Sequence, residues 1–195
     1  MQQKDELRSA LLPRLAATAA TERVASSQQV CARLLDQSVV SQAAALALYA
    51  AYDWELDLST VVEAAFERGA CVAFPRWTEE GYQMVPITSL ADLAPGKYGI
   101  CEPCKSLPAM RQHNTLTWIV PGLAFSGGGA RLGRGAGHYD RMLANARGPR
   151  IAVCRDWQLQ EELPQGSFDI LMTHVATDKR WLTCQPTPTK KGHHI

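Results

Sequence analysis

Glycine and arginine alternate in one short stretch of the chain, "GGGARLGRGAGHYDR" (127–141), in a pattern suited to binding an anion. An ordered glycine gives up more conformational freedom on folding than any other residue, so a glycine-rich run needs a compensating use. Backbone N–H groups of such a loop can turn toward a phosphate, and a following helix adds the partial positive charge of its N-terminus. Arg131, Arg134 and Arg141 add cations, so we predict a phosphate-binding loop.

This loop matches neither of two common phosphate-binding motifs. No Gly-Lys-Ser/Thr sequence follows the glycines, and "GARLGRG" (129–135) does not fit the dinucleotide-binding fingerprint. On composition alone, a glycine-rich turn without a ligand and a flexible linker both stay open as alternatives.

Helices and strands must position this loop, and four segments are predicted to be helical. They are residues 4–20, 21–37, 59–69 and 138–147. We expect Pro13 to break the first helix and Thr21 to cap the second. Ser59 is expected to cap the third helix, which Gly69 then ends.

Apolar runs between these helices predict strands. They cover residues 44–52, 70–75, 82–87, 117–122, 150–154 and 169–176, with 82–87 as an edge or hairpin strand. Strands that alternate with helices of this length predict an α/β fold, with an open, mostly parallel sheet covered by helices on both faces. The glycine loop follows one strand and precedes a helix, which places it at the carboxyl edge of the sheet, where ligands bind.

Composition favours one compact domain with ordinary soluble character. The 195 residues are 46% hydrophobic and 20% charged, and the net charge of +1 gives no indication of nucleic acid or a membrane surface as a partner. The longest apolar runs are too short to span a bilayer, and the N-terminus lacks the apolar core of a signal peptide. We expect a cytoplasmic monomer that binds small molecules, with a domain at 1–185 and a loose tail at 186–195.

Six cysteines agree with a reducing compartment, because most of them lie in apolar runs. "CEPC" (101–104) is formally a C-x-x-C pair, which is a redox motif or half of a zinc site in other proteins. No second pair completes a four-thiolate zinc shell, and the pair does not open a helix that would lower a thiol pKa. Two incidental reduced cysteines are the favoured interpretation.

The segment "PGLAFSGGGARLGRGAGHYDRML" (121–143) resembles the signature of 5-formyltetrahydrofolate cyclo-ligases, also called methenyltetrahydrofolate synthetases, of the form PG-x-AFD-x-x-G-x-RLG-x-G-x-GYYDR. Further matches follow in the family's order: "KDELR" (4–8), "YDWELD" (52–57), "FPR" (74–76), "YGICEP" (98–103) and "DWQLQEELP" (156–164). The resemblance therefore covers nearly the whole chain. It implies closure of 5-formyltetrahydrofolate to 5,10-methenyltetrahydrofolate through phosphorylation of the formyl oxygen, with Mg²⁺ as cofactor and ATP as co-substrate, releasing ADP and phosphate.

The same resemblance implies the site residues, with Arg134 as the cation nearest the chemistry. It places the nucleotide against Lys4, Arg8, Arg131, Leu132, Gly133, Arg134, Gly135, Ala136, Gly137, His138 and Tyr139. It places the folate against Arg8, Ala50, Glu55, Arg134, Gly135, Ala136, Gly137, His138 and Tyr139. The resemblance assigns metal binding to Asp140 and Asp169. Phosphoryl transfer relies on positioning and charge, so no nucleophilic Ser or Cys triad is expected.

Each of these roles has a structural alternative. Lys4 and Arg8 lie four residues apart and share a helix face, which is a solvated surface in many proteins. Asp140 and Asp169 also suit helix caps or turns. A carboxylate at Glu55 can accept two parallel hydrogen bonds from a pterin edge, although a surface-loop acid is the alternative.

Aromatic residues near these positions are ambiguous in the same way. Tyr52, Trp54 and Tyr139 suit packing on the pterin or aminobenzoyl rings of a folate, or packing in the core.

Three positions depart from the family pattern: Ser126 replaces Asp, Ala136 replaces Gly or Lys, and His138 replaces Tyr or Phe. His138 is the most consequential, because it introduces a group that titrates near neutral pH. Two other functions remain to be weighed: a nucleotide- or folate-binding regulator that lost turnover, and a sugar-phosphate-handling α/β enzyme. Lys4, Arg8, Arg134 and Asp140 favour turnover, since binding alone does not require a metal carboxylate.

Overall fold

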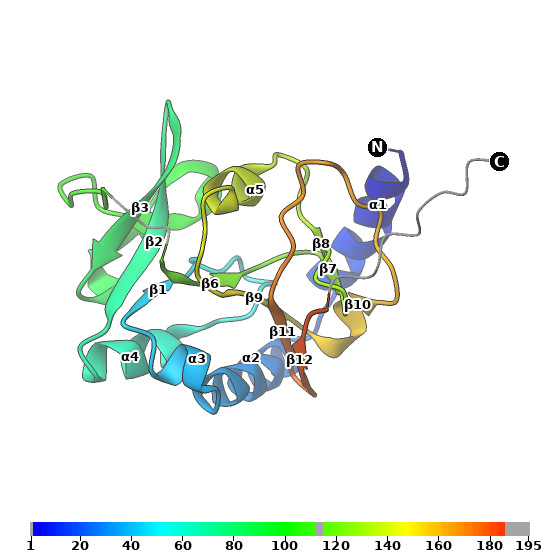
Figure 1. Ribbon diagram of the computed structural model, residues 1–195, viewed down its shortest axis with the longest axis horizontal. Coiled ribbons are helices and arrows are strands. Elements are labelled where there is room, and N and C mark those ends of the chain that lie inside the picture. The colour runs from blue at the N-terminus through cyan, green and yellow to red at the C-terminus, as the bar shows by residue number, and fades with distance from the viewer. Residues whose placement is uncertain (1, 112–114, 186–195) are drawn as a thin grey trace.

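A seven-stranded sheet crosses the middle of the computed structural model, which describes residues 2–111 and 115–185 (Figure 1). Its strand order is β12-β11-β9-β6-β1-β2-β3. In that order the strands are Trp181–Thr183, His174–Thr177, Arg150–Cys154, Thr117–Val120, Ala45–Ala47, Cys71–Thr78 and Gly81–Ile87. Neighbours from β11 to β2 pair in parallel, and the edge strands β12 and β3 pair antiparallel. The mostly parallel sheet is therefore confirmed, and so is 82–87 as an edge strand in a hairpin.

Helices cover both faces of this sheet, as the sequence predicts (Figure 1). On one face lie α2 (Ala20–Leu35), α3 (Ser38–Ser41) and α4 (Ser59–Glu67), and on the other lies α5 (His138–Leu143). Val30 and Val61 of the first group pack in one buried cluster with Ile119 of β6, and Leu143 of α5 packs with Trp118 in a second. Alternate residues of β6 thus face opposite layers, because successive side chains of a strand point to opposite sides.

Smaller elements flank this central sheet. The first helix, α1 (Gln2–Ala16), packs through Leu11 and Leu15 against a three-stranded sheet of order β10-β7-β8. Those strands are Leu159–Gln160, Ala124–Ser126 and Arg131–Leu132. A hairpin joins β4 (Leu93–Pro95) to β5 (Cys101–Pro103). The described residues also include three short 3₁₀ helices: η1 (Leu90–Asp92), η2 (Lys97–Gly99) and η3 (Asp156–Gln158).

Several predicted helix boundaries were wrong. Helix α1 passes through Pro13 and ends three residues later, at Ala16, so the proline does not break it. The second helix starts at Ala20 with Ala19 as its N-cap residue, not Thr21, and Leu58 rather than Ser59 precedes the third. Helix α5 stops at Leu143 instead of 147. Such boundaries depend on packing and loop geometry more than on capping preference.

Strand boundaries show a more useful difference. The predicted strand 44–52 forms a strand only over Ala45–Ala47, and residues 50–57 continue as a loop outside the sheet. The predicted strand 169–176 begins only at His174. In both cases the apolar run continues into loop residues that pack on the core. Hydrophobic periodicity does not distinguish such loop residues from strand residues.

The glycine-rich stretch also divides in two. Residues 124–132 form the β7–β8 hairpin, and at its turn Gly129 has a φ of 88° and lies so close to residue 172 that an added Cβ would come within 2.4 Å of the Met172 carbonyl oxygen. Only residues 133–137 form a loop before α5. The first three glycines therefore serve the fold, contrary to the prediction of one continuous anion-binding loop.

Three further expectations concern the cysteines, membrane-spanning helices and the C-terminal tail. All six cysteines are free thiols. Among the residues that the structure describes, no helix is long and apolar enough to cross a membrane. The predicted tail at 186–195 lies outside the described residues.

Candidate active site

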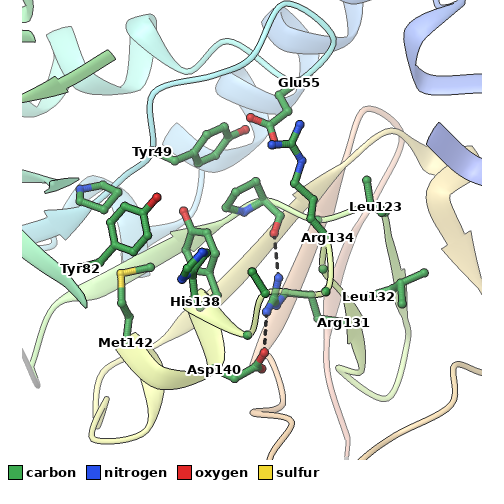
Figure 2. Close-up of a pocket in the computed structure, with 18 of the residues that line it drawn as sticks. Tyr49, Glu55, Tyr82, Leu123, Arg131, Leu132, Arg134, His138, Asp140 and Met142 are labelled. Atoms are coloured by element: carbon green, nitrogen blue, oxygen red, sulfur yellow. Dashed lines mark hydrogen bonds and ion pairs between the residues drawn. The ribbon is translucent and has the colours of Figure 1, made fainter. Parts of the chain in front are cut away.

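One cavity of about 760 Å³ opens between α1, the loop before α5 and the segment that follows β1 (Figure 2). Its lining contains every residue predicted for the site: Lys4, Arg8, Ala50, Glu55, Arg131 through Asp140, and Asp169. Positions separated by up to 165 residues in the sequence thus surround one volume, which is large enough for a drug-sized ligand. Figure 2 shows Glu55 and Tyr49 at one end, Asp140 and Arg131 at the other, and Arg134 reaching between them.

Backbone geometry explains the glycines of the 133–137 loop. Gly135 and Gly137 have φ values of 106° and 65°, which other residues adopt only at a cost. Ala136 between them departs from the family pattern and lies exposed in the lining of the cavity. Because α5 has only six residues, its dipole is short, and side-chain cations must supply most of the positive charge.

Cations gather at the end of the cavity near α1. Lys4 Nζ pairs with Asp169, and Arg8 Nε donates to the Gly133 carbonyl at 2.9 Å. Both side chains are only 19% exposed, so Lys4 and Arg8 do not lie on a solvated helix face. Arg131 Nη2 donates to Asp140 at 3.1 Å, and its buried Nε has no hydrogen-bond partner among the described residues. An unsatisfied buried donor of a cation beside a cavity suits an anionic ligand.

Two carboxylates lie among these cations. Asp140, in the first turn of α5 as predicted, accepts from the Ile170 backbone N–H at 3.3 Å through its other oxygen. Partial burial acts to raise the pKa of Asp169, but Lys4 and the Gly166 N–H hold that pKa below its usual value. Asp140 contacts the backbone next to Asp169, so the two acids belong to one end of the cavity. Among the described residues no group of three or more His, Cys, Asp or Glu forms a complete metal cage.

Glu55 lies at the opposite end, in the tight turn Tyr52–Glu55. The backbone N–H of Tyr52 donates to its Oε2 at 3.0 Å, and the Glu55 N–H donates to the Tyr52 carbonyl at 2.8 Å. Burial raises the pKa of this carboxyl to about 6, against the lowering effects of the Tyr52 N–H and the Arg134 charge. Glu55 is therefore a half-buried acid that faces a cavity, and the surface-loop alternative does not describe it.

Sequence reasoning missed several residues that line the cavity. Tyr49 and Tyr82 line the cavity, and so do Glu102 and Met142. Burial raises the pKa of Tyr49, whose hydroxyl donates to the Leu56 carbonyl at 2.9 Å. Tyr49 ends an apolar run and Tyr82 lies on an edge strand, so neither carries a local signal that separates it from a core or surface tyrosine. Only the fold brings them to the cavity.

His138 is held in a defined protonation state. Arg141 Nη2 lies 2.8 Å from its Nδ1, and since a guanidinium only donates, that nitrogen must be the acceptor. Burial, followed by the Arg141 charge, lowers the pKa of His138. Its ring meets Tyr82 edge to face, with centroids 4.9 Å apart. The residue that replaces the family's Tyr or Phe thus keeps an aromatic contact, and its lowered pKa favours the neutral imidazole.

Tyr52 and Trp54 stack on each other, with ring centroids 5.6 Å apart and an interplanar angle of 8°, and Trp54 also packs against a buried cluster, which is the core alternative for that residue. The Arg134 guanidinium lies over both rings. Tyr139 lies under Arg131, whose Cζ is 5.3 Å from the ring centroid, and it also packs against the core.

Comparison with known proteins adds independent evidence. Residues 1–178 match the 5-formyltetrahydrofolate cyclo-ligase family. The 5-formyltetrahydrofolate cyclo-ligase of Mycolicibacterium smegmatis is 46% identical over 91 residues, which are 45% of this chain and 47% of that protein, so the alignment spans about half of the relative. The cyclo-ligase of Escherichia coli K12 is 28% identical over 160 residues, 78% of this chain and 88% of that one.

Solved structures agree with this match. The NMR structure of 5,10-methenyltetrahydrofolate synthetase from Aquifex aeolicus superposes with a TM-score of 0.82 at 27% identity, covering 98% of this chain and 97% of its own. The 5,10-methenyltetrahydrofolate synthetase of Mycoplasma pneumoniae has a TM-score of 0.72 at 17% identity, covering 90% and 98%, and shows the shared fold.

Proposed function

Because the chain belongs to the 5-formyltetrahydrofolate cyclo-ligase family, we propose that it converts 5-formyltetrahydrofolate to 5,10-methenyltetrahydrofolate at the expense of ATP, with Mg²⁺ as cofactor. The observation that carries the proposal is the cavity itself, which joins a cationic end around Lys4, Arg8 and Arg131 to a ring-binding end around Glu55. A nucleotide triphosphate suits the first end and a pterin suits the second. Arg134 lies between them, where the two substrates would meet.

The proposed chemistry solves one problem: a formamide oxygen is a poor leaving group. The formyl oxygen bonds to the γ-phosphorus of ATP as the bond to ADP breaks. The N10 amine then bonds to the formyl carbon and loses its proton, and the carbon–oxygen bond breaks to release phosphate. The protein has little covalent chemistry to do, so orientation and charge screening provide most of the acceleration.

Each end of the cavity has a defined task in this reaction. Lys4, Arg8 and Arg131 bind the phosphates, with the unsatisfied Nε of Arg131 as one available donor. Arg134 screens the charge that develops on the transferring phosphoryl group. Glu55 accepts the N–H and amino hydrogens of the pterin edge as a bidentate pair.

Asp140 and Asp169 fit magnesium, because this hard ion is held in nucleotide enzymes by one or two carboxylates together with substrate phosphates. Both acids are paired with cations, to Arg131 and Lys4, and both lie at the phosphate end. Bound Mg²⁺ supplies further charge neutralisation on the phosphates.

ATP turnover should depend on the folate, because the formyl oxygen is the phosphoryl acceptor. Enzyme with ATP and Mg²⁺ should release ADP only when 5-formyltetrahydrofolate is added, at one ADP per methenyltetrahydrofolate formed. Coupled ADP detection and product absorbance measure the two rates. Equal ADP release without folate would overturn the mechanism, and binding of both ligands without product would favour a non-catalytic regulator.

Glu55→Gln should weaken folate binding while ATP binding persists. Losing the charge and one acceptor oxygen is expected to raise KM for 5-formyltetrahydrofolate by about 10- to 100-fold, since hydrogen bonds to charged groups contribute roughly 1.5–3 kcal/mol. The pH profile gives the second measurement. The raised pKa of about 6 means that Glu55 takes up a proton as the pH falls through 6, so kcat/KM for the folate should fall there.

The variant provides its own control for this profile. In Glu55→Gln the decline near pH 6 should disappear, because the carboxyl group that titrates is gone. The substrates titrate equally in both proteins, so they do not cause a difference between the two pH profiles. The same decline in both enzymes, or an unchanged KM, would contradict a role for Glu55 in folate binding.

A further inference from the structure

The guanidinium of Arg134 rests on two aromatic rings. Its Cζ lies 3.8 Å from the centroid of the Tyr52 ring and 4.7 Å from that of Trp54. The two rings are nearly parallel, with an interplanar angle of 8°, and stack on each other, so the guanidinium has two aromatic neighbours. We call Tyr52 and Trp54 the aromatic seat. Both distances are within the range of a cation–π contact.

Contacts with other parts of the chain hold the aromatic seat in place. The carbonyl of Trp54 accepts from Nη1 of Arg155 at 3.1 Å, and that arginine is only 1% exposed. The Trp54 ring packs against a buried cluster that includes Leu123 and Leu163. Hydrogen bonds in both directions close the Tyr52–Glu55 turn. A seat fixed at several points can hold a mobile side chain in one place.

Arg134 needs such support. It lies between Gly133 and Gly135, it is exposed, and a long arginine side chain loses rotamer entropy when it is held in one place. No hydrogen bond or ion pair to its guanidinium is present among the described residues. The aromatic seat, with the charge of Glu55 nearby, is therefore what the structure offers to hold it (Figure 2).

We propose that Tyr52 and Trp54 are positioning residues, which hold the Arg134 guanidinium between the two substrate-binding ends of the cavity. A cation–π contact takes up no hydrogen bond of the guanidinium, so its N–H groups stay available to the transferring phosphoryl group and the formyl oxygen. This inference rests on the proposed catalytic role of Arg134. It assigns to the two rings a task in turnover that folate packing alone does not include.

Removing one ring should lower kcat through Arg134. Tyr52→Leu and Trp54→Leu are expected to reduce kcat by about 5- to 30-fold, the range that corresponds to a cation–π contact of roughly 1–2 kcal/mol, with little change in KM for ATP. Tyr52→Phe keeps the ring and should restore most of kcat. Trp157→Leu is the matched control, because Trp157 stacks under Arg14 at 4.1 Å outside the cavity. It should leave kcat within about twofold of the wild type.

The decisive measurement is a double-mutant cycle between Tyr52→Leu and Arg134→Ala, measured as kcat at high enzyme concentration. Residues that act as a unit are not additive, so Tyr52→Leu should cause no further loss once Arg134 is absent. The same fold-loss in both backgrounds would overturn the proposal and leave Tyr52 as a direct substrate contact. The Trp54→Leu variant could fail to fold, because the Trp54 ring supports the core. The double-mutant cycle between Tyr52→Leu and Arg134→Ala tests the proposal in that case too.

Failure of the aromatic seat is distinguishable from failure of the proposed function. An additive cycle in an enzyme that forms methenyltetrahydrofolate rejects the seat alone. Full activity in Arg134→Ala rejects the catalytic role of Arg134 and the seat with it. Wild-type protein that forms no methenyltetrahydrofolate rejects the proposed reaction itself.

Discussion

Arg134→Ala is expected to lower kcat by about 100- to 1000-fold, the usual effect of removing one group that stabilises charge in a transition state. The Arg134 side chain reaches from the loop before α5 toward Glu55, so its guanidinium lies inside the cavity that would hold both substrates (Figure 2). Binding of ATP should weaken much less, by about 5-fold or less, because Lys4, Arg8 and Arg131 remain. Steady-state kinetics and equilibrium ATP binding measure the two effects separately.

Arg147→Ala is the control for this variant, since Arg147 is exposed and does not line the cavity. Its kcat should match the wild type. Equal losses of turnover and of ATP affinity in Arg134→Ala would identify Arg134 as a ground-state anchor for the phosphates rather than a transition-state contact.

Asp140→Asn should remove most magnesium-dependent turnover, by about 100-fold or more at limiting Mg²⁺, because metal-ion charge stabilisation contributes several kcal/mol. Asparagine keeps the shape and an oxygen that can still accept from the Ile170 N–H, but it loses the negative charge that a hard cation prefers. Folate binding without nucleotide should be unchanged. Raising the Mg²⁺ concentration should recover part of the loss by mass action.

The structure adds a stability cost to this variant. Asp140 pairs with Arg131, whose side chain is only 6% exposed, so the neutral amide leaves a nearly buried cation without its partner. Because Asp140 itself is 23% exposed, we expect a loss of roughly 1 kcal/mol in the free energy of unfolding rather than the larger cost of a fully buried pair.

Asp156→Asn is the matched control, since Asp156 pairs with Arg180 outside the cavity. Its magnesium dependence should equal that of the wild type. Full activity of Asp140→Asn at limiting Mg²⁺ would place the metal elsewhere, with Asp169 as the next candidate. A collapse of thermal stability instead would mean that Asp140 serves the fold.

The residues predicted from the sequence line one cavity, and they were found through the family resemblance together with some local signals. The glycines at 133, 135 and 137 with the intervening Arg134 mark a loop for an anion, and two of these glycines adopt positive φ angles. Lys4 and Arg8 share one helix face through simple periodicity. The alternation of strands and helices predicted the parallel sheet, because strands buried on both faces read as continuous apolar runs.

Other features depended on contacts that no local pattern contains. Gly127 to Gly129 look the same as the later glycines, yet they turn a hairpin, because the backbone of residue 172 lies against Gly129. Tyr52 and Trp54 are a short aromatic run in the sequence, and only the folded chain brings Arg134, which follows 80 residues later, onto their faces. Such contacts form between segments that are distant in the sequence, and they produce no periodic pattern of residues.

The sequence by itself determined which chemical groups are present, the sheet-and-helix class and the loop that can surround a phosphate, because composition and spacing act locally. Tertiary structure decided which of those groups face one another: Lys4 against Asp169, Arg131 against Asp140, and Arg134 on its two rings. It also raised the pKa of Glu55 to about 6, since burial depends on everything packed around the carboxyl group. Charge, burial and distance between remote residues are properties of the packed chain.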